Sequence, residues 1–181
     1  MKLIVTVGMP GSGKDELVEV ARGMGLATLK MGDLVRDETR RRGLPLTNAN
    51  VGRIASEERD KHGPGIWAQR ALPKLTETRM LVDGCRSDSE VAVFRHNFGD
   101  LFVLGIFAAP ETRYDRLSAR RRSDDVDLQD FYDRDRRELK WGIGNAFALA
   151  DGMIVNEGTL DEFKRGARSI LERVLAKDDA D

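Results

Sequence analysis

Short apolar runs alternate along the chain with longer segments in which apolar residues recur at helical spacing. The apolar runs predict strands at 3–7, 27–31, 80–82, 101–108 and 153–155. The helical spacing predicts helices at 14–24, 32–42, 48–61, 64–76, 87–97, 110–122, 128–141 and 159–175. Strands that alternate with helices predict a parallel sheet with helices on both faces. Ligands of such folds bind beyond the carboxyl ends of the strands, so motifs that follow a strand are the first candidates for function.

The first strand end is followed by the sequence Gly-Met-Pro-Gly-Ser-Gly-Lys-Asp at residues 8–15. Its glycines remove side chains that would block a curled backbone, whose N–H groups then point toward phosphate oxygens. Lys14 brings a positive charge to the outer phosphates, and the start of the next helix adds its partial positive charge. This pattern predicts a loop that binds the phosphates of a nucleoside triphosphate through Gly8, Met9, Pro10, Gly11, Ser12, Gly13, Lys14 and Asp15. The alternative is an ordinary glycine turn that ends a strand.

The length and composition of the chain limit the classes of protein to which it can belong. The 181 residues suffice for one domain with a sizeable core, and no repeat or linker divides them. The net charge of −1 gives no general attraction to nucleic acid or to a membrane surface, and no apolar run approaches the length of a membrane span. The single cysteine, Cys85, fits a reducing compartment, so we expect a cytoplasmic protein.

Two further strand ends each carry an aspartate and, three residues later, an arginine. Asp33 and Arg36 follow the second strand, and Asp83 and Arg86 follow the third. A planar guanidinium can bind two oxygens at once, so Arg36 and Arg86 are candidates for binding an anionic substrate. Asp83 ends an apolar run beside the glycine-rich loop, where an acid can organise Mg²⁺ through water. The alternatives are a helix cap for Asp33 and a local ion pair between Asp83 and Arg86.

These motifs resemble those of the P-loop nucleoside monophosphate kinases of the adenylate kinase group. The Asp33–Arg36 and Asp83–Arg86 pairs are similar to the segments with which that group binds a monophosphate. The sequence Asp-Arg-Leu-Ser-Ala-Arg-Arg at 115–121 is similar to the motif that opens the group's mobile lid, and Arg-Ser-Asp-Asp at 122–125 is similar to the motif that closes it. The two motifs abut, which implies a lid reduced to a short turn. The resemblance covers most of the chain and is closest to archaeal adenylate-kinase-related proteins, with a dephospho-CoA-kinase-like ending at 155–159.

The resemblance implies a role for each matching residue. Lys14, Arg86 and Arg120 would stabilise the charge of the transferred phosphoryl group, and Arg116 would stack on the base of ATP. Such cations suit a loose transition state that spreads negative charge over oxygens. The substrate-binding set that the resemblance implies is Asp33, Arg36, Arg86, Arg122 and Arg134, with Arg136 as an alternative to Arg134. The alternative for most arginines between 113 and 137 is a solvated helix surface with ion pairs along the helix.

We expect a single P-loop kinase-like domain over residues 1–181, with a helical acceptor-binding insert at 37–78 and a reduced, arginine-rich lid at 116–137. Asp15 stands where many P-loop enzymes place a Ser or Thr that binds Mg²⁺. Adenylate kinases have a glycine there, so the departure does not exclude a kinase. It implies that Mg²⁺ is held largely through water, near Asp15 or Asp83. A reduced lid implies either ready hydrolysis of ATP or slow transfer, because a lid excludes water.

The expected function is Mg-ATP-dependent phosphoryl transfer to a nucleoside monophosphate or another small nucleotide-like acceptor. Dephospho-CoA is the alternative acceptor, and its hydroxyl would need a base, for which Asp33 is the candidate. The alternative class is a regulatory ATPase or nucleotide-dependent binding module with slow ATP hydrolysis, which Asp15 and the reduced lid favour. Trp67 is expected either to pack against helices or to line the acceptor pocket. A homodimer is an option that the sequence leaves open.

Overall fold

The computed structural model of the chain describes residues 1–119 and 127–176. Its strands are β1 (Lys2–Val7), β2 (Ala27–Lys30), β3 (Arg79–Cys85), β4 (Asp100–Phe107) and β5 (Gly152–Val155). Its α-helices are α1 (Lys14–Gly23), α2 (Met31–Arg41), α3 (Asn48–His62), α4 (Ile66–Ala71), α5 (Asp88–Asn97), α6 (Pro110–Ala119), α7 (Leu128–Trp141), α8 (Ile143–Ala148) and α9 (Leu160–Ala176). A short 3₁₀ helix, η1 (Leu72–Lys74), follows α4.

The described strands form one five-stranded sheet in the order β2-β3-β1-β4-β5, and all neighbours are parallel. The central strand β1 pairs with β3 on one side, where Leu3 lies opposite Met80, and with β4 on the other, where Leu3 lies opposite Leu101. The glycine-rich loop leaves the carboxyl end of β1, so it lies between the ends of β3 and β4. The predicted α/β P-loop fold with a five-stranded parallel sheet is thus confirmed.

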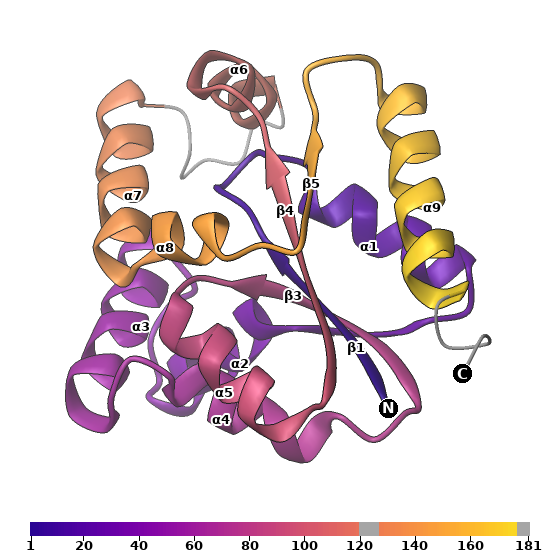
Figure 1. Cartoon of the computed structure of the whole chain (residues 1–181). Coiled ribbons are helices and arrows are strands. Elements are labelled where there is room, and N and C mark those ends of the chain that lie inside the picture. The colour runs from indigo at the N-terminus through magenta and orange to yellow at the C-terminus, as the bar shows by residue number, and fades with distance from the viewer. Residues whose placement is uncertain (120–126, 177–181) are drawn as a thin grey trace.

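The sheet separates two hydrophobic clusters, because successive side chains of a strand point to opposite faces. Leu3, Val5 and Val7 of β1 face a cluster built with α2, α3, α4, α5 and α8. Ile4 faces a second cluster, built with α1 and α9. Figure 1 shows these helices on opposite sides of the sheet, with α6 beyond the end of β4 and α7 on the side of α3 and α8. The result is the expected three-layer arrangement. None of the described helices has the length and hydropathy needed to cross a membrane.

The structure departs from the predicted elements in three places. The predicted helix at 64–76 ends as α4 at Ala71, because Pro73 in η1 has no N–H to continue α-helical bonding. Strand β3 continues past Asp83 to Cys85, so Asp83 lies within the strand. The short helix α8 was not predicted. Helices α3 and α4, which lie within residues 37–78, share a hydrophobic cluster with β1 and β3, so this segment is part of the common core.

Candidate functional site

The glycine-rich loop curls tightly between β1 and α1. Gly11 has φ of +81° and Gly13 has φ of +108°, in the left-handed region that favours glycine. A Cβ on Gly11 would also lie 2.8 Å from the carbonyl oxygen of Arg113, and one on Gly13 would collide with the side chain of Asn156. Both glycines are therefore required by conformation and by space. Ser12 Oγ is buried in this loop and has no hydrogen-bond partner in the described parts of the chain. A cradle of this shape with an unpaired hydroxyl fits a phosphate group.

The Lys14 side chain folds back onto its own loop. Its Nζ donates hydrogen bonds to the carbonyl oxygens of Gly8, at 2.6 Å, and Met9, at 2.9 Å. Burial lowers the pKa of Lys14 to about 8, although the nearby carboxylate of Asp83 acts in the opposite direction. An amine held this way can exchange the two carbonyl oxygens for the oxygens of a bound anion without moving far.

Two long-range contacts fix the loop backbone. Asn156, just after β5, donates from Nδ2 to the carbonyl oxygen of Ser12 at 2.9 Å. Arg113 of α6 donates to the carbonyl oxygen of Pro10 at 3.2 Å, and its guanidinium pairs with both carboxylate oxygens of Asp135 on α7. Sequence reasoning assigned neither residue. Asn156 lies in the 155–159 segment that the resemblance singled out, whereas nothing distinguishes Arg113 within an arginine-rich stretch.

The predicted lid residues are placed only in part. Arg116 of α6 donates from Nη2 to the side-chain oxygen of Asn156 at 3.4 Å, and its Nη1 is buried with no hydrogen-bond partner in the described residues. Arg116 thus reaches the glycine-rich loop through Asn156. Arg120 and Arg122 lie outside the described residues. Arg134 is on the cavity side of α7, whereas Arg136 is exposed and pairs with Asp133 at 3.2 Å.

The candidate metal-organising acid lies at the expected end of the sheet. Thr6 Oγ1 donates to Asp83 Oδ1 at 2.7 Å, which holds one oxygen of this buried carboxylate beside β1. Asp15 lies instead at the start of α1, where its carboxylate pairs with Lys30 at 2.7 Å. Within residues 1–119 and 127–176, no group of three or more His, Cys, Asp or Glu side chains is placed to hold a metal ion. Asp83 is thus a buried acid whose charge acts on Lys14, whereas Asp15 is paired with Lys30.

A cavity of about 340 Å³ lies at the carboxyl end of β3, between α2, α3 and α7. Its size is within the range of ~300–1,000 Å³ that is usual for small-molecule sites. Its aromatic walls are Trp67, which is 1% exposed, and Trp141. The described arginines that line it outnumber the carboxylates by five to one: Arg36, Arg59, Arg86, Arg134 and Arg137, against Glu138. Lys14 interacts electrostatically with Arg86, Glu138 and Arg134, so this cavity adjoins the glycine-rich loop.

The two predicted Asp–Arg pairs behave differently. Arg36 pairs with Asp33 at 3.2 Å, on the exposed start of α2, and only Arg36 reaches the cavity wall. Arg86 pairs with Glu138 of α7. One oxygen of Asp83 accepts from Thr6, and the ion-pair partner of Arg86 comes from a distant helix, although the charge of Asp83 also acts on Arg86.

Glu138 is a buried carboxylate in a group of positive charges. Burial acts to raise the pKa of Glu138, but the charges of Arg86, Arg134 and Lys14 outweigh burial and lower it. One oxygen pairs with Arg86, and the other, Oε2, is buried without a hydrogen-bond partner among the described residues. The cations around this carboxylate gather positive charge near Lys14, a feature that sequence reasoning did not connect with Glu138.

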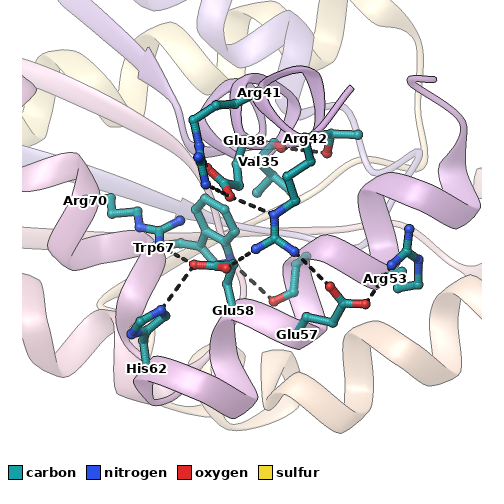
Figure 2. Close-up of polar contacts among 12 residues, drawn as sticks. Val35, Glu38, Arg41, Arg42, Arg53, Glu57, Glu58, His62, Trp67 and Arg70 are labelled. Carbon is teal, nitrogen blue, oxygen red and sulfur yellow. Dashed lines mark hydrogen bonds and ion pairs between the residues drawn. The ribbon is translucent and has the colours of Figure 1, made fainter. Parts of the chain in front are cut away.

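Helices α2, α3 and α4, which supply lining residues of the cavity, are joined to one another by a network of ion pairs, which Figure 2 shows. Arg42, the residue that follows α2, contacts Glu38 of α2 and both Glu57 and Glu58 of α3. Glu58 also contacts Arg70 of α4, so the network joins three helices. Hydrogen bonds from Arg41 and Arg42 lower the pKa of Glu38 to about 2. This network, defined by Glu38, Arg41, Arg42, Glu57, Glu58 and Arg70, fixes α2, α3 and α4 around the cavity.

The fold is that of the P-loop kinases among solved structures. A gluconokinase from Sinorhizobium meliloti 1021 matches 98% of this chain and 94% of its own, with a TM-score of 0.62 and 18% identity. A shikimate kinase from Acinetobacter baumannii in complex with shikimate matches 98% of this chain and 94% of its own, with a TM-score of 0.61 and 17% identity. Identities this low support a shared fold. A family model described as an AAA domain matches residues 7–130.

Relatives by sequence define the family more narrowly. A UPF0200 protein of Thermoplasma acidophilum is 43% identical over 171 residues, which are 93% of this chain and 94% of that protein. A UPF0200 protein of Methanothrix thermoacetophila is 45% identical over 179 residues, which are 96% of this chain and 98% of that protein. The chain belongs to the UPF0200 family.

Proposed function

We propose that this protein transfers the γ-phosphoryl group of Mg-ATP to a small acceptor that is itself anionic, and most specifically to a nucleoside monophosphate or a similar nucleotide. The observation that carries the proposal is the arginine-lined cavity next to Lys14. A wall with five guanidiniums and one carboxylate favours an acceptor that carries phosphate, because guanidinium forks match phosphate oxygens. The likeness of the fold to small-molecule kinases agrees with this class of reaction.

Each end of the site has its own part in this proposal. The loop from Gly8 to Asp15 binds the phosphates of ATP, and Arg116 covers the donor beside Asn156. Arg36 and Arg86 bind the acceptor, with Asp33 orienting Arg36. Lys14, Arg86 and Arg134 share the charge of the transferred group, because they surround one anion-binding position. When bound, Mg²⁺ supplies further positive charge, and Asp83 would hold it through water.

The proposal keeps the predicted organisation of the chain. Residues 37–78 form the acceptor-binding wall, and residues 116–137, which include the undescribed Arg120 and Arg122, act as a short lid. The relation to the adenylate kinase group stays part of the proposal, because both Asp–Arg motifs flank the cavity. A cytoplasmic location is likewise proposed, since the thiol of Cys85 is free and buried.

A hydroxyl acceptor such as dephospho-CoA receives less support from the geometry. Its hydroxyl would need a base, and the candidate Asp33 is exposed and paired with Arg36. Glu138 is the lining carboxylate, but neighbouring cations lower its pKa, which makes it a weaker base. A phosphate acceptor needs no base, because its oxygen is already deprotonated at neutral pH.

The test is a product screen with ATP labelled at the γ-phosphate. Wild-type protein is incubated with Mg-ATP and, separately, each common nucleoside monophosphate, dephospho-CoA, or no acceptor. Label in a nucleoside diphosphate is the expected result. Label in phosphorylated dephospho-CoA alone would show that the acceptor is this hydroxyl and not a nucleoside monophosphate. Release of inorganic phosphate at the same rate with and without every acceptor would contradict phosphoryl transfer and favour a regulatory ATPase.

A further inference from the structure

The end of the cavity at Trp141 holds two of the five lining arginines, Arg59 and Arg137, to which the proposed transfer assigns no individual role. The guanidinium carbon of Arg59 lies 4.4 Å from the centroid of the Trp141 ring, and that of Arg137 lies 5.6 Å from it. Trp141 is about two helical turns beyond Arg134 on α7, which is ~10 Å along the axis. The guanidinium carbon of Arg86 lies 6.0 Å from the same centroid, so Arg137 and the proposed acceptor-phosphate position at Arg86 border one ring.

Arg59 is committed to the protein itself. Its Nη1 donates to the carbonyl oxygen of Ala55 at 3.1 Å, and its Nη2 pairs with Glu90 at 2.7 Å. Only 8% of Arg59 is exposed, and it lies over the Trp141 ring, whose Nε1 donates to Ser56 Oγ at 3.2 Å. The charge of Arg59 is thus neutralised by Glu90, although its buried Nε has no hydrogen-bond partner in the described residues.

Arg137 lies against the same ring without a carboxylate partner in the described residues. Its Nε is buried and unpaired. Burial lowers the pKa of Arg137, and the charges of Arg134 and Arg86 add to this effect against that of Glu138. The guanidinium fits against Gly52 of α3, where a Cβ would approach its carbon to 2.6 Å. A half-buried cation that faces a cavity without a counter-ion is costly, and a bound anion removes that cost.

We propose that Arg137 binds a second oxyanion of the acceptor, next to the phosphate that Arg86 binds and distinct from it. This inference rests on the proposed function, which assigns the acceptor's first phosphate to the same cavity. Guanidinium groups present only donors, and Arg59 and Arg137 lie against the ring of Trp141, so this end matches an oxygen-rich group. The oxyanion is a phosphate or a carboxylate, and the acceptor is then a nucleotide with two separate anionic groups.

The test is an equilibrium binding measurement by calorimetry, which does not depend on turnover. The probes are 5′-AMP, adenosine 2′,5′-bisphosphate, adenosine 3′,5′-bisphosphate and the 3′-O-carboxymethyl ether of 5′-AMP. Wild-type protein should bind at least one doubly anionic probe about tenfold or more tightly than 5′-AMP, as expected for a charge-assisted hydrogen bond. The probe that gains affinity shows whether phosphate or carboxylate is preferred.

The variant Arg137→Gln should lose this preference and bind 5′-AMP within about threefold of wild type. Gly52→Ala should do the same, because its methyl group displaces the guanidinium while alanine favours the helix. Arg168→Gln, which removes an exposed charge on α9, should leave the preference unchanged. The proposal is wrong if every probe binds wild type within threefold of 5′-AMP, or if Arg137→Gln weakens all probes equally. A retained preference without any labelled product would overturn the proposed function and leave this site standing.

Discussion

Arg86 and Glu138 pair across the cavity, from the end of β3 to the last turn of α7. Both side chains are largely removed from solvent, and Glu138 keeps one oxygen without a partner in the described residues. The pair holds a guanidinium at the place where an acceptor phosphate is proposed to bind. An incoming phosphate would compete with Glu138 for Arg86, which links the structural contact to substrate binding.

Arg86→Ala should remove acceptor binding while ATP still binds. The variant also leaves Glu138 as an unpaired buried charge, which should lower the free energy of unfolding by ~3–5 kcal/mol. The double variant Arg86→Ala/Glu138→Gln should recover most of that stability but not the acceptor affinity. Chemical denaturation and calorimetric titration with each nucleotide measure the two effects. Equal loss of ATP and acceptor affinity in the double variant would contradict the role assigned to Arg86.

ATP binding should depend on pH through Lys14. The pKa of Lys14 is about 8 in the free protein, so its ammonium group is lost as the pH rises through that value. The value of kcat/KM for ATP, which reports the free protein, should be steady below pH 8 and fall up to ~10-fold per pH unit above it. Lys14→Met should be slow at every pH and lack this decline. A wild-type profile that stays flat to pH 10 would exclude the assigned role.

Asn156→Ala should weaken ATP binding, although Asn156 need not touch the nucleotide. Its side chain holds the Ser12 carbonyl, so its loss frees the loop and leaves a buried carbonyl without its donor. We expect the free energy of unfolding to fall by ~1–2 kcal/mol and the ATP dissociation constant to rise several-fold. Asn97→Ala is the matched control, because Asn97 donates to a backbone carbonyl at the exposed end of α5. Unchanged ATP affinity in Asn156→Ala would show that the loop keeps its shape without this contact.

The ion-pair network that joins α2, α3 and α4 should make stability fall in acid. The pKa of Glu38 is about 2 in the folded protein, below its ordinary value of 4.5, so its ionised form stabilises the fold above pH 4.5. That contribution is lost as the pH falls from 4.5 toward 2. Glu38→Gln should cost ~1 kcal/mol at pH 7 and nothing near pH 2, measured by urea unfolding. Glu77→Gln, in an exposed loop, is the control, and an equal effect of both variants would contradict the network's role.

The fold was predictable because each strand and the glycine-rich loop show a pattern within a short stretch of sequence. Every predicted strand corresponds to an observed one, and the loop from Gly8 to Lys14 is recognisable from residue types alone. Helix α8 was missed because six residues, Ile143 to Ala148, are too few to show a helical period. Helix α4 ends early because of Pro73, and a proline in the sequence is itself a signal that a helix ends nearby.

Residue types alone mark candidate site residues where these follow a strand, and the resemblance added Arg134, which lines the cavity from α7. Arg36 and Arg86 are marked by that position, and both line the cavity. Arg59 and Arg137 reach the same cavity from α3 and α7, and their sequence neighbours include other arginines that face solvent. Which arginine faces inward depends on how two helices pack, and that relationship is not local in the sequence. The pairing of Arg86 with Glu138 was missed for the same reason.

The most direct measurement is the ratio of phosphorylated acceptor formed to ATP consumed. Phosphorus NMR measures this ratio with the best acceptor of the product screen. The proposal predicts one phosphorylated acceptor for each ATP, with ATP consumption at least tenfold slower when the acceptor is omitted, an order-of-magnitude expectation for a site that favours transfer over water. Consumption of ATP at an unchanged rate, with only inorganic phosphate as the second product, would contradict the assignment of the arginine-lined cavity to an acceptor.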